Sequence, residues 1–132
     1  MENRPKTILI VDDDKDFSQS VEDLLTNEGY HVLKAYNGKK GLELAIKEHP
    51  DLMILDVMMA YDTEGFEISR EIPNRPELKD MAVIMVTGIT SEKNLPFKFE
   101  PDETWLPVDS VLEKPIAPEK LLKEIKKHLN KA

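Results

Sequence analysis

Short apolar runs alternate with longer amphipathic stretches along the chain, and this alternation is typical of a parallel β-sheet whose strands are joined by helices. The runs at residues 7–11 and 82–86 are nearly continuous, as expected of strands buried on both faces. The run at residues 30–36 alternates between apolar and polar positions instead. We therefore expect five strands, at residues 7–11, 30–36, 52–55, 82–86 and 108–112.

Between these runs, apolar residues recur at the spacing of a helix, as Phe17, Val21 and Leu25 do in the first stretch. Capping side chains, and the glycine and proline residues that end helices, mark the boundaries. The expected boundary residues are, in chain order, Asp14 or Asp16, Gly29, Asn37-Gly38, His49-Pro50, Pro73 and Pro118. The expected helices cover about residues 16–27, 38–48, 65–72 and 118–130.

The stretch between residues 87 and 114 does not fit a regular helix. It contains Pro96, Pro101 and Pro107, and a helix would lose a hydrogen bond and meet a steric clash at each of them. We expect a shortened or irregular helix there, which would be the fourth in chain order, before the one at residues 118–130. An irregular segment should follow it, anchored to the sheet by aromatic side chains. The aromatic residues are Phe97, Phe99 and Trp105.

Size and composition narrow the possibilities. With 132 residues the chain fits one domain, and we expect residues 1–132 to form it. The 26 acidic residues outnumber the 18 basic ones and give a formal net charge of −8, which argues against nucleic acid or an anionic membrane as a partner. The absence of cysteine excludes disulfides and thiolate metal sites. Without a signal peptide or an apolar segment long enough to span a bilayer, the expected location is the cytoplasm.

Segments with side chains that can bind a metal ion or take part in a reaction follow four of the five expected strands. The segments are Asp12-Asp13-Asp14, Asp56, Thr87-Gly88 and Glu113-Lys114-Pro115. In an open parallel α/β sheet, ligands bind outside the carboxyl ends of the strands. We therefore expect acids, a hydroxyl and an ammonium group to converge on one crevice.

Each of these groups suits phosphoryl chemistry. Clustered carboxylates repel one another unless a cation joins them, and hard oxygen ligands suit Mg²⁺, which also takes phosphate oxygens as ligands. A carboxylate can itself act as the nucleophile and form an aspartyl phosphate. A metal ion, a lysine and a hydroxyl can then hold the oxygens of the transferred group.

The sequence resembles the receiver domains of two-component response regulators. The segments that carry the resemblance are ILIVDDD at residues 8–14, LMILDVMM at 52–59, VTG at 86–88 and EKPI at 113–116. The segments occur in the family's order, and the resemblance extends over essentially the whole chain, from the first strand to the last helix. The resemblance implies a flavodoxin-like, three-layer α/β fold, in which a five-stranded parallel sheet of order 2-1-3-4-5 has helices on both faces.

The resemblance also implies a role for each site residue. Asp56 would be the phosphoacceptor, and Asp12, Asp13, Asp56 and the backbone carbonyl of Met58 would hold Mg²⁺ or Mn²⁺. Thr87 and Lys114 would contact the phosphoryl group and act in switching, and Lys114 would pair with Asp56 when it is unmodified. Pro115 would follow a cis peptide bond.

In functional terms, the resemblance implies a stand-alone receiver that accepts its phosphoryl group from a sensor histidine kinase or a phosphotransfer protein. It would signal by binding a downstream protein, and it would catalyse only its own phosphorylation and dephosphorylation. A metal-dependent phosphatase would need a second acid two residues after the nucleophile, and Met58 stands there.

Two departures from the family pattern keep an alternative open. The loop at residues 60–65 lacks the family's proline, and Val111 stands where the family commonly has its switch aromatic, three residues before Lys114. The alternative is a receiver-like constitutive interaction module that has lost phosphorylation-dependent switching.

The remaining polar and sulfur-containing residues have simpler explanations. We expect surface or helix-end roles for His31, His49 and His128. The methionines in or beside strands, such as Met53 and Met85, are expected to fill the core.

Overall fold

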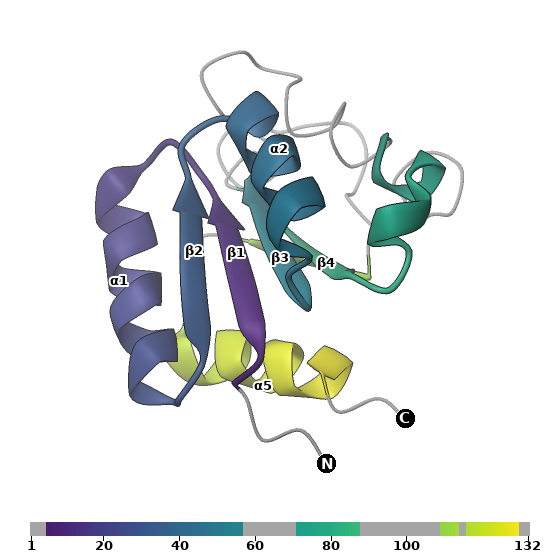
Figure 1. The fold of residues 1–132 in the computed structure, drawn as a ribbon. Coiled ribbons are helices and arrows are strands. Elements are labelled where there is room, and N and C mark those ends of the chain that lie inside the picture. Colours follow the sequence, from purple (N-terminus) through teal and green to yellow (C-terminus); the bar gives the residue numbers. More distant parts are fainter. Residues whose placement is uncertain (1–4, 57–70, 88–108, 114–115, 130–132) are drawn as a thin grey trace, which may run out of the picture.

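A five-stranded parallel sheet forms the centre of the computed structural model, which describes residues 5–56, 71–87, 109–113 and 116–129 (Figure 1). The strands follow the order β2-β1-β3-β4-β5, which confirms the expected topology. They are β1 (Thr7–Val11), β2 (His31–Ala35), β3 (Leu52–Asp56), β4 (Ala82–Thr87) and β5 (Ser110–Glu113).

Helices cover both faces of the sheet, in the three layers that the sequence predicted. α2 (Gly38–Glu48) lies in front of the sheet in Figure 1, whereas α5 (Pro118–Leu129) lies behind it. α1 (Lys15–Asn27) shares the face of α5, since its buried side chains belong to the same apolar cluster. Successive strand residues point to opposite faces, so Leu9 and Val11 pack with the α2 side whereas Ile8 and Ile10 pack with α1 and α5.

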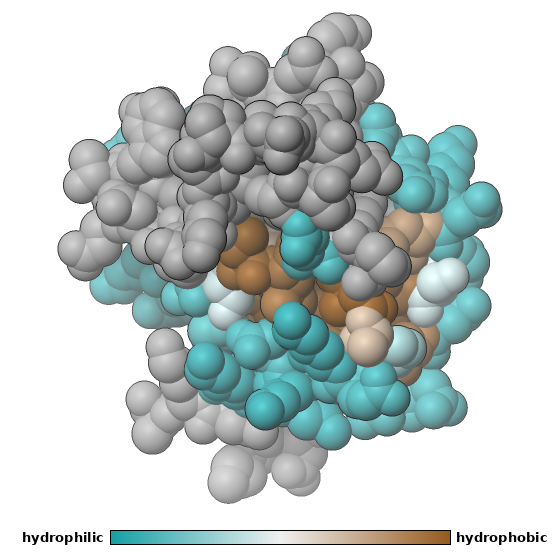
Figure 2. Space-filling view, turned by 180° about the vertical axis from the view of Figure 1, so that it is seen from behind, coloured by the Kyte–Doolittle hydropathy of each residue, from teal (hydrophilic) through white to brown (hydrophobic). Residues whose placement is uncertain are grey.

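Seen from behind, the face of α1 and α5 shows apolar residues in its middle with hydrophilic residues around them (Figure 2). Several side chains on this face are only partly buried, among them Leu24, Val32 and Leu122. The core methionines behave as expected, because Met53 and Met85 are fully buried.

The ends of the first two helices confirm the expected caps. The side chain of Asp14 accepts a hydrogen bond from the amide of Phe17 at 3.0 Å, and the side chain of Asn37 accepts one from Lys40 at 2.8 Å. After α1 the chain turns at Gly29, whose φ of +92° suits a residue without a Cβ.

Three strands extend beyond their predicted ends because they pair with a neighbour. Asp56 pairs with Val86 and Thr87 pairs with Glu113, so β3, β4 and β5 each gain one residue at the end. β5 begins two residues later than predicted. The carboxylate of Asp109 accepts a hydrogen bond from the amide of Val83 at 2.7 Å. The side chain of Asp109 is therefore bonded to the beginning of β4, and Asp109 lies outside β5.

The region after β3 continues beyond the predicted end of the helix. Glu71 is the last α-helical residue before Pro73, but Pro73 itself lies inside a 3₁₀ helix, η1 (Ile72–Asn74), and a second one, η2 (Pro76–Leu78), follows. A proline in the first turn of such a helix removes an amide that has no partner there anyway. The start of this predicted helix, at residues 65–70, and the irregular segment with its shortened fourth helix, at 88–108, lie outside the described residues.

The three histidines lie where they were expected, at the surface or at a helix end, and His128 has an additional contact. His31 and His49 are exposed, but the side chain of His128 is only 5% exposed, because it shares the inward stripe of α5 with Leu121 and Ile125. Its Nε2 lies 2.7 Å from the hydroxyl of Ser110. His128, at the end of α5, therefore also ties this helix to β5.

Candidate phosphoacceptor and metal site

The register of the central strands brings two aspartates together at the carboxyl edge of the sheet. Val11, the last residue of β1, pairs with Leu55 on the neighbouring strand β3. Asp12 and Asp56 each come one residue after this pair, so the two parallel strands deliver both side chains to the same place. The sequence predicted this meeting from the position of each acid at a strand end.

Both of these carboxylates are buried. Asp12 is 1% exposed and Asp56 4% exposed, whereas Asp13 is exposed. One carboxylate oxygen from each of the three residues lies within 4.8 Å of the others. Buried acids at this separation oppose one another's ionisation unless a positive charge lies between them.

Hydrogen bonds fix the backbone around Asp12. Its amide donates to the carbonyl of Ala35 at 3.1 Å, which ties the end of β1 to the end of β2. Its Oδ1 accepts from the amide of Asp14 at 2.8 Å, and this turn leads directly into α1. The carboxylate of Asp12 is therefore held in place between a strand end and a helix cap.

Ser18 is a supporting residue that the sequence analysis missed. It is fully buried on α1, and its hydroxyl donates to the backbone carbonyl of Asp12 at 3.4 Å. A sequence signal was present, because Ser18 lies on the same helical stripe as the buried residues Val21 and Leu25. A serine on an inward stripe needs a partner, and here the partner is the backbone of a site residue.

The donor set of this cluster fits a divalent cation. The three residues offer carboxylate oxygens, which are the ligands that Mg²⁺ and Mn²⁺ prefer. Their spacing allows one ion to contact all three. The cluster offers neither sulfur nor imidazole, so it does not resemble a zinc site.

The other predicted site residues are described only in part. Thr87 ends β4 opposite Glu113, so its backbone lies at the same edge of the sheet as the carboxylates. The side chain of Thr87, and all of Met58, Lys114 and Pro115, lie outside the described residues. The structure thus brings together three of the predicted residues, Asp12, Asp13 and Asp56.

Comparison with protein-family models matches residues 8–126 to one family, described as the response regulator receiver domain. This match covers β1 except for its first residue, the other four strands completely, and most of α5.

Solved structures give the same result. A response regulator receiver domain protein from Methanospirillum hungatei is 35% identical, with a TM-score of 0.77 over 96% of this chain and 94% of that chain. The chemotaxis protein CheY4 from Vibrio cholerae is 29% identical, with a TM-score of 0.78 over 95% of this chain and 99% of that chain.

A more distant structure shares the fold. The receiver domain of a sensor histidine kinase from Pseudomonas aeruginosa is 19% identical, with a TM-score of 0.80 over 96% of this chain and 99% of that chain. That structure has a magnesium ion coordinated in its active site cleft.

Among the described residues of this protein, no helix has the length and apolar character needed to cross a membrane.

Proposed function

Because this chain belongs to the response regulator receiver domain family, we propose that Asp56 accepts a phosphoryl group from a phosphohistidine on a sensor kinase or a phosphotransfer protein. The observation that carries the proposal is the meeting of three carboxylates, two of them buried, at the carboxyl edge of a parallel sheet. Asp56 comes from the central strand β3, flanked by β1 and β4, so neighbouring strands can supply groups on both sides of it.

The reaction itself is a displacement at phosphorus. An oxygen of the Asp56 carboxylate attacks the phosphorus atom, the bond from phosphorus to the donor histidine nitrogen breaks, and the imidazole leaves with the electron pair. Bound Mg²⁺ or Mn²⁺ would neutralise charge on the transferred oxygens, with Asp12, Asp13, Asp56 and the carbonyl of Met58 as the proposed protein ligands.

Thr87 and Lys114 complete the proposed site. Thr87 would donate a hydrogen bond to one phosphoryl oxygen, and the ammonium group of Lys114 would pair with another. The end of β4 supports the role of Thr87, because it lies at the edge where Asp56 emerges. The assignment of Pro115 as a cis proline remains a prediction from the resemblance.

Receiver domains are signalling modules and do not turn over external substrates. We therefore propose that residues 1–132 act as one domain whose output is the binding of another protein. The net charge of −8 argues against direct recognition of nucleic acid or an anionic membrane. A cytoplasmic location is part of the same proposal, and fractionation of cells that produce the tagged protein would test it.

Phosphorylation by a small donor tests the acceptor. Incubation with acetyl phosphate and Mg²⁺ should give a single modification that hydroxylamine removes, because an aspartyl phosphate is an acyl phosphate. Asp56→Asn should abolish it, since an amide is not a nucleophile here. Intact-mass spectrometry measures both outcomes. Asp80→Asn, an exposed aspartate before β4, is the matched control and should label normally. Equal labelling of the Asp56→Asn variant would contradict the assignment.

Val111 favours one alternative function. It lies in β5, pairs with Met85, and has no aromatic ring to swing. If switching had been lost, the fold would serve as a constitutive interaction module. Titration with Mg²⁺, followed by the fluorescence of Trp105 or by calorimetry, separates the two functions. The phosphoacceptor proposal expects binding at millimolar metal, whereas the constitutive module expects none.

A further inference from the structure

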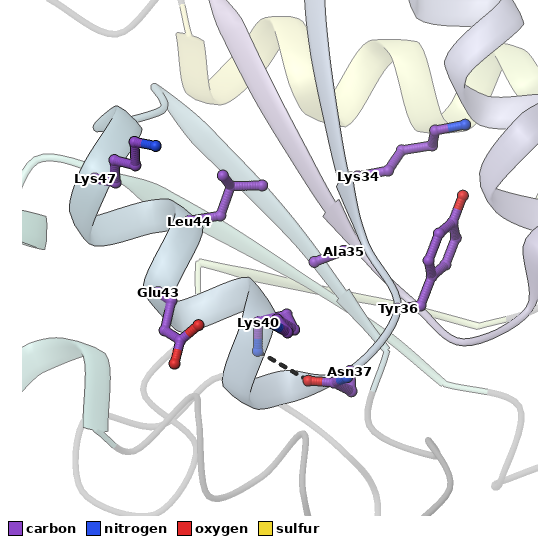
Figure 3. A pocket seen from close by; sticks show the side chains of 8 residues that line it. All are labelled: Lys34, Ala35, Tyr36, Asn37, Lys40, Glu43, Leu44 and Lys47. Atoms are coloured by element: carbon purple, nitrogen blue, oxygen red, sulfur yellow. Dashed lines mark hydrogen bonds between the residues drawn. The ribbon is translucent and has the colours of Figure 1, made fainter.

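A pocket of about 510 Å³ lies beside the end of β2 (Figure 3). Its walls come from β2, from the connection that follows it and from α2. Ala35 faces α2, whereas Lys34 and Tyr36 lie on the other side of the strand, as alternation along a strand requires. The pocket therefore follows the edge of β2 and is not enclosed between the sheet and α2.

β2 is an open edge of the sheet. On its inner side the amide of His31 donates to Lys6 at 2.9 Å, and the carbonyl of Ala35 accepts from Asp12 at 3.1 Å. Peptide groups alternate in direction along a strand, so Val32 and Lys34 direct theirs away from β1. Within the described chain, no strand pairs with that side. An unpaired strand edge offers a row of donors and acceptors to another extended chain.

The pocket is positively charged in an otherwise acidic molecule. Three lysines line it against one acid, Glu43, whereas the whole chain has a net charge of −8. Lys40 and Lys47 are exposed on α2, seven residues apart, so they share one face of the helix. Neither has an ion-pair partner among the described residues. Lys34 lies 2.7 Å from Glu22, and this carboxylate raises the pKa of Lys34, which stays charged.

An aromatic residue completes the pocket. Tyr36 is 39% exposed and is the most exposed large apolar side chain of the described residues. The ammonium group of Lys15 lies 5.3 Å from the centre of its ring. The half-buried Leu44 adds apolar surface on α2. An occupant would thus find apolar contacts as well as lysines.

We propose that this pocket binds an extended, acidic segment of a partner protein, which pairs with the open edge of β2 and places acidic side chains near Lys40 and Lys47. Main-chain hydrogen bonds provide the affinity in this mode of recognition, and side-chain contacts provide the selectivity. Alternate side chains of the segment lie on one face, about 7 Å apart, so several acids can face the lysines. The proposal does not depend on phosphorylation of Asp56.

Nuclear magnetic resonance of the ¹⁵N-labelled full chain tests this surface. The probe is a short peptide of alternating glutamate and valine with blocked ends, added at about 0.15 M salt, where distant charges are screened. We expect the largest amide shifts at Val32 and Lys34, with smaller ones in α2. The same peptide with lysine in place of glutamate should cause no shifts.

Charge reversal provides the matched comparison. The double substitution K40E/K47E should weaken binding of the glutamate peptide about tenfold, because two favourable pairs become unfavourable. K123E/K127E on exposed positions of α5 changes the net charge equally and should leave the affinity unchanged. The Asp56→Asn variant should also bind normally, so the failure of the phosphoacceptor proposal would be distinguishable from the failure of this one.

Several results would overturn the proposal. They are an absence of binding, shifts centred away from β2, equal weakening by K123E/K127E, and equal shifts with inorganic phosphate, which would reduce the pocket to a simple anion site. Tighter binding of a single-stranded oligonucleotide to the same amides would likewise replace the acidic protein segment with nucleic acid.

Discussion

At the scale of single residues, the carboxylates of the site favour the binding of a cation. Asp12 and Asp56 are both buried, with carboxylate oxygens within 4.8 Å of each other. Two like charges at this distance repel by between about 1 and 3 kcal/mol, depending on the effective dielectric constant. A divalent cation converts this repulsion into binding energy, so we expect metal to stabilise the fold.

Asp12→Asn should therefore act mainly on the metal-bound state. Without metal, the variant should unfold close to the temperature of the unsubstituted protein, because asparagine has nearly the same shape as aspartate. Its amide oxygen can still accept from Asp14, which preserves the turn. With Mg²⁺, the increase in unfolding temperature seen for the unsubstituted protein should largely disappear. Thermal unfolding with and without Mg²⁺ measures both effects.

Asp14→Asn is the control for this prediction. Asparagine caps a helix as well as aspartate does, and Asp14 does not belong to the group of carboxylates that can share an ion. Its response to Mg²⁺ should therefore stay close to normal. If both variants lost the response equally, the metal would not be bound where the three carboxylates meet.

At the scale of elements, the position of α2 depends on a close approach to β1. Gly41 is buried on α2, and a Cβ added there would lie 2.6 Å from Cγ2 and 2.8 Å from Cγ1 of Val11. Both of these atoms belong to the branched side chain of Val11, which is fully buried and has little freedom to move. Because Val11 directly precedes Asp12, the packing of α2 bears on the geometry of the site.

Gly41→Ala should destabilise the fold and slow phosphorylation. Overpacking of this kind costs about 1–3 kcal/mol, and the strain would fall on the strand end that holds Asp12. Urea unfolding measures the stability, and the rate of labelling by acetyl phosphate measures the effect on the site.

Gly29→Ala is a matched substitution at a different element. It adds the same methyl group where nothing lies within 4 Å, but at a φ of +92°, so its cost of about 1 kcal/mol comes from the backbone alone. We expect normal phosphorylation rates in this variant once it is folded. Equal slowing in both variants would show that lost stability, and not a displaced Asp12, is responsible.

At the scale of the whole molecule, the excess of acids opposes compaction. The formal net charge is −8, and three of the aspartates crowd one edge of the sheet. Self-repulsion of this kind is screened by salt, with a Debye length that falls from about 30 Å at 0.01 M to about 8 Å at 0.15 M.

Adding monovalent salt should therefore raise the unfolding temperature over this range. Asp56→Asn should keep most of the increase, because the repulsion is shared by many acids, but it should lose the additional increase that Mg²⁺ gives. Calorimetry at matched ionic strength distinguishes the two contributions. A fall in unfolding temperature with salt would show that favourable ion pairs, such as that of Lys34 with Glu22, outweigh the repulsion.

The layers of the fold, and the edge of the sheet at which the site lies, follow from local patterns in the sequence. Strand and helix periods are local properties, so the five strands, the caps at Asp14 and Asn37, and the placement of Asp12 and Asp56 at strand ends could be predicted from short windows. The ends of several strands differ from the predicted ones. β5 begins after Asp109, for example, where the side chain of Asp109 accepts a hydrogen bond from the neighbouring strand β4.

Contacts away from the strand ends depended on the packing of whole elements. The burial of His128 against Ser110, the support of Asp12 by Ser18, and the pocket beside β2 all join residues from separate elements. Such meetings depend on the register and packing of whole elements, which no local pattern encodes. The sequence therefore supplied the chemical groups, and packing determined their neighbours.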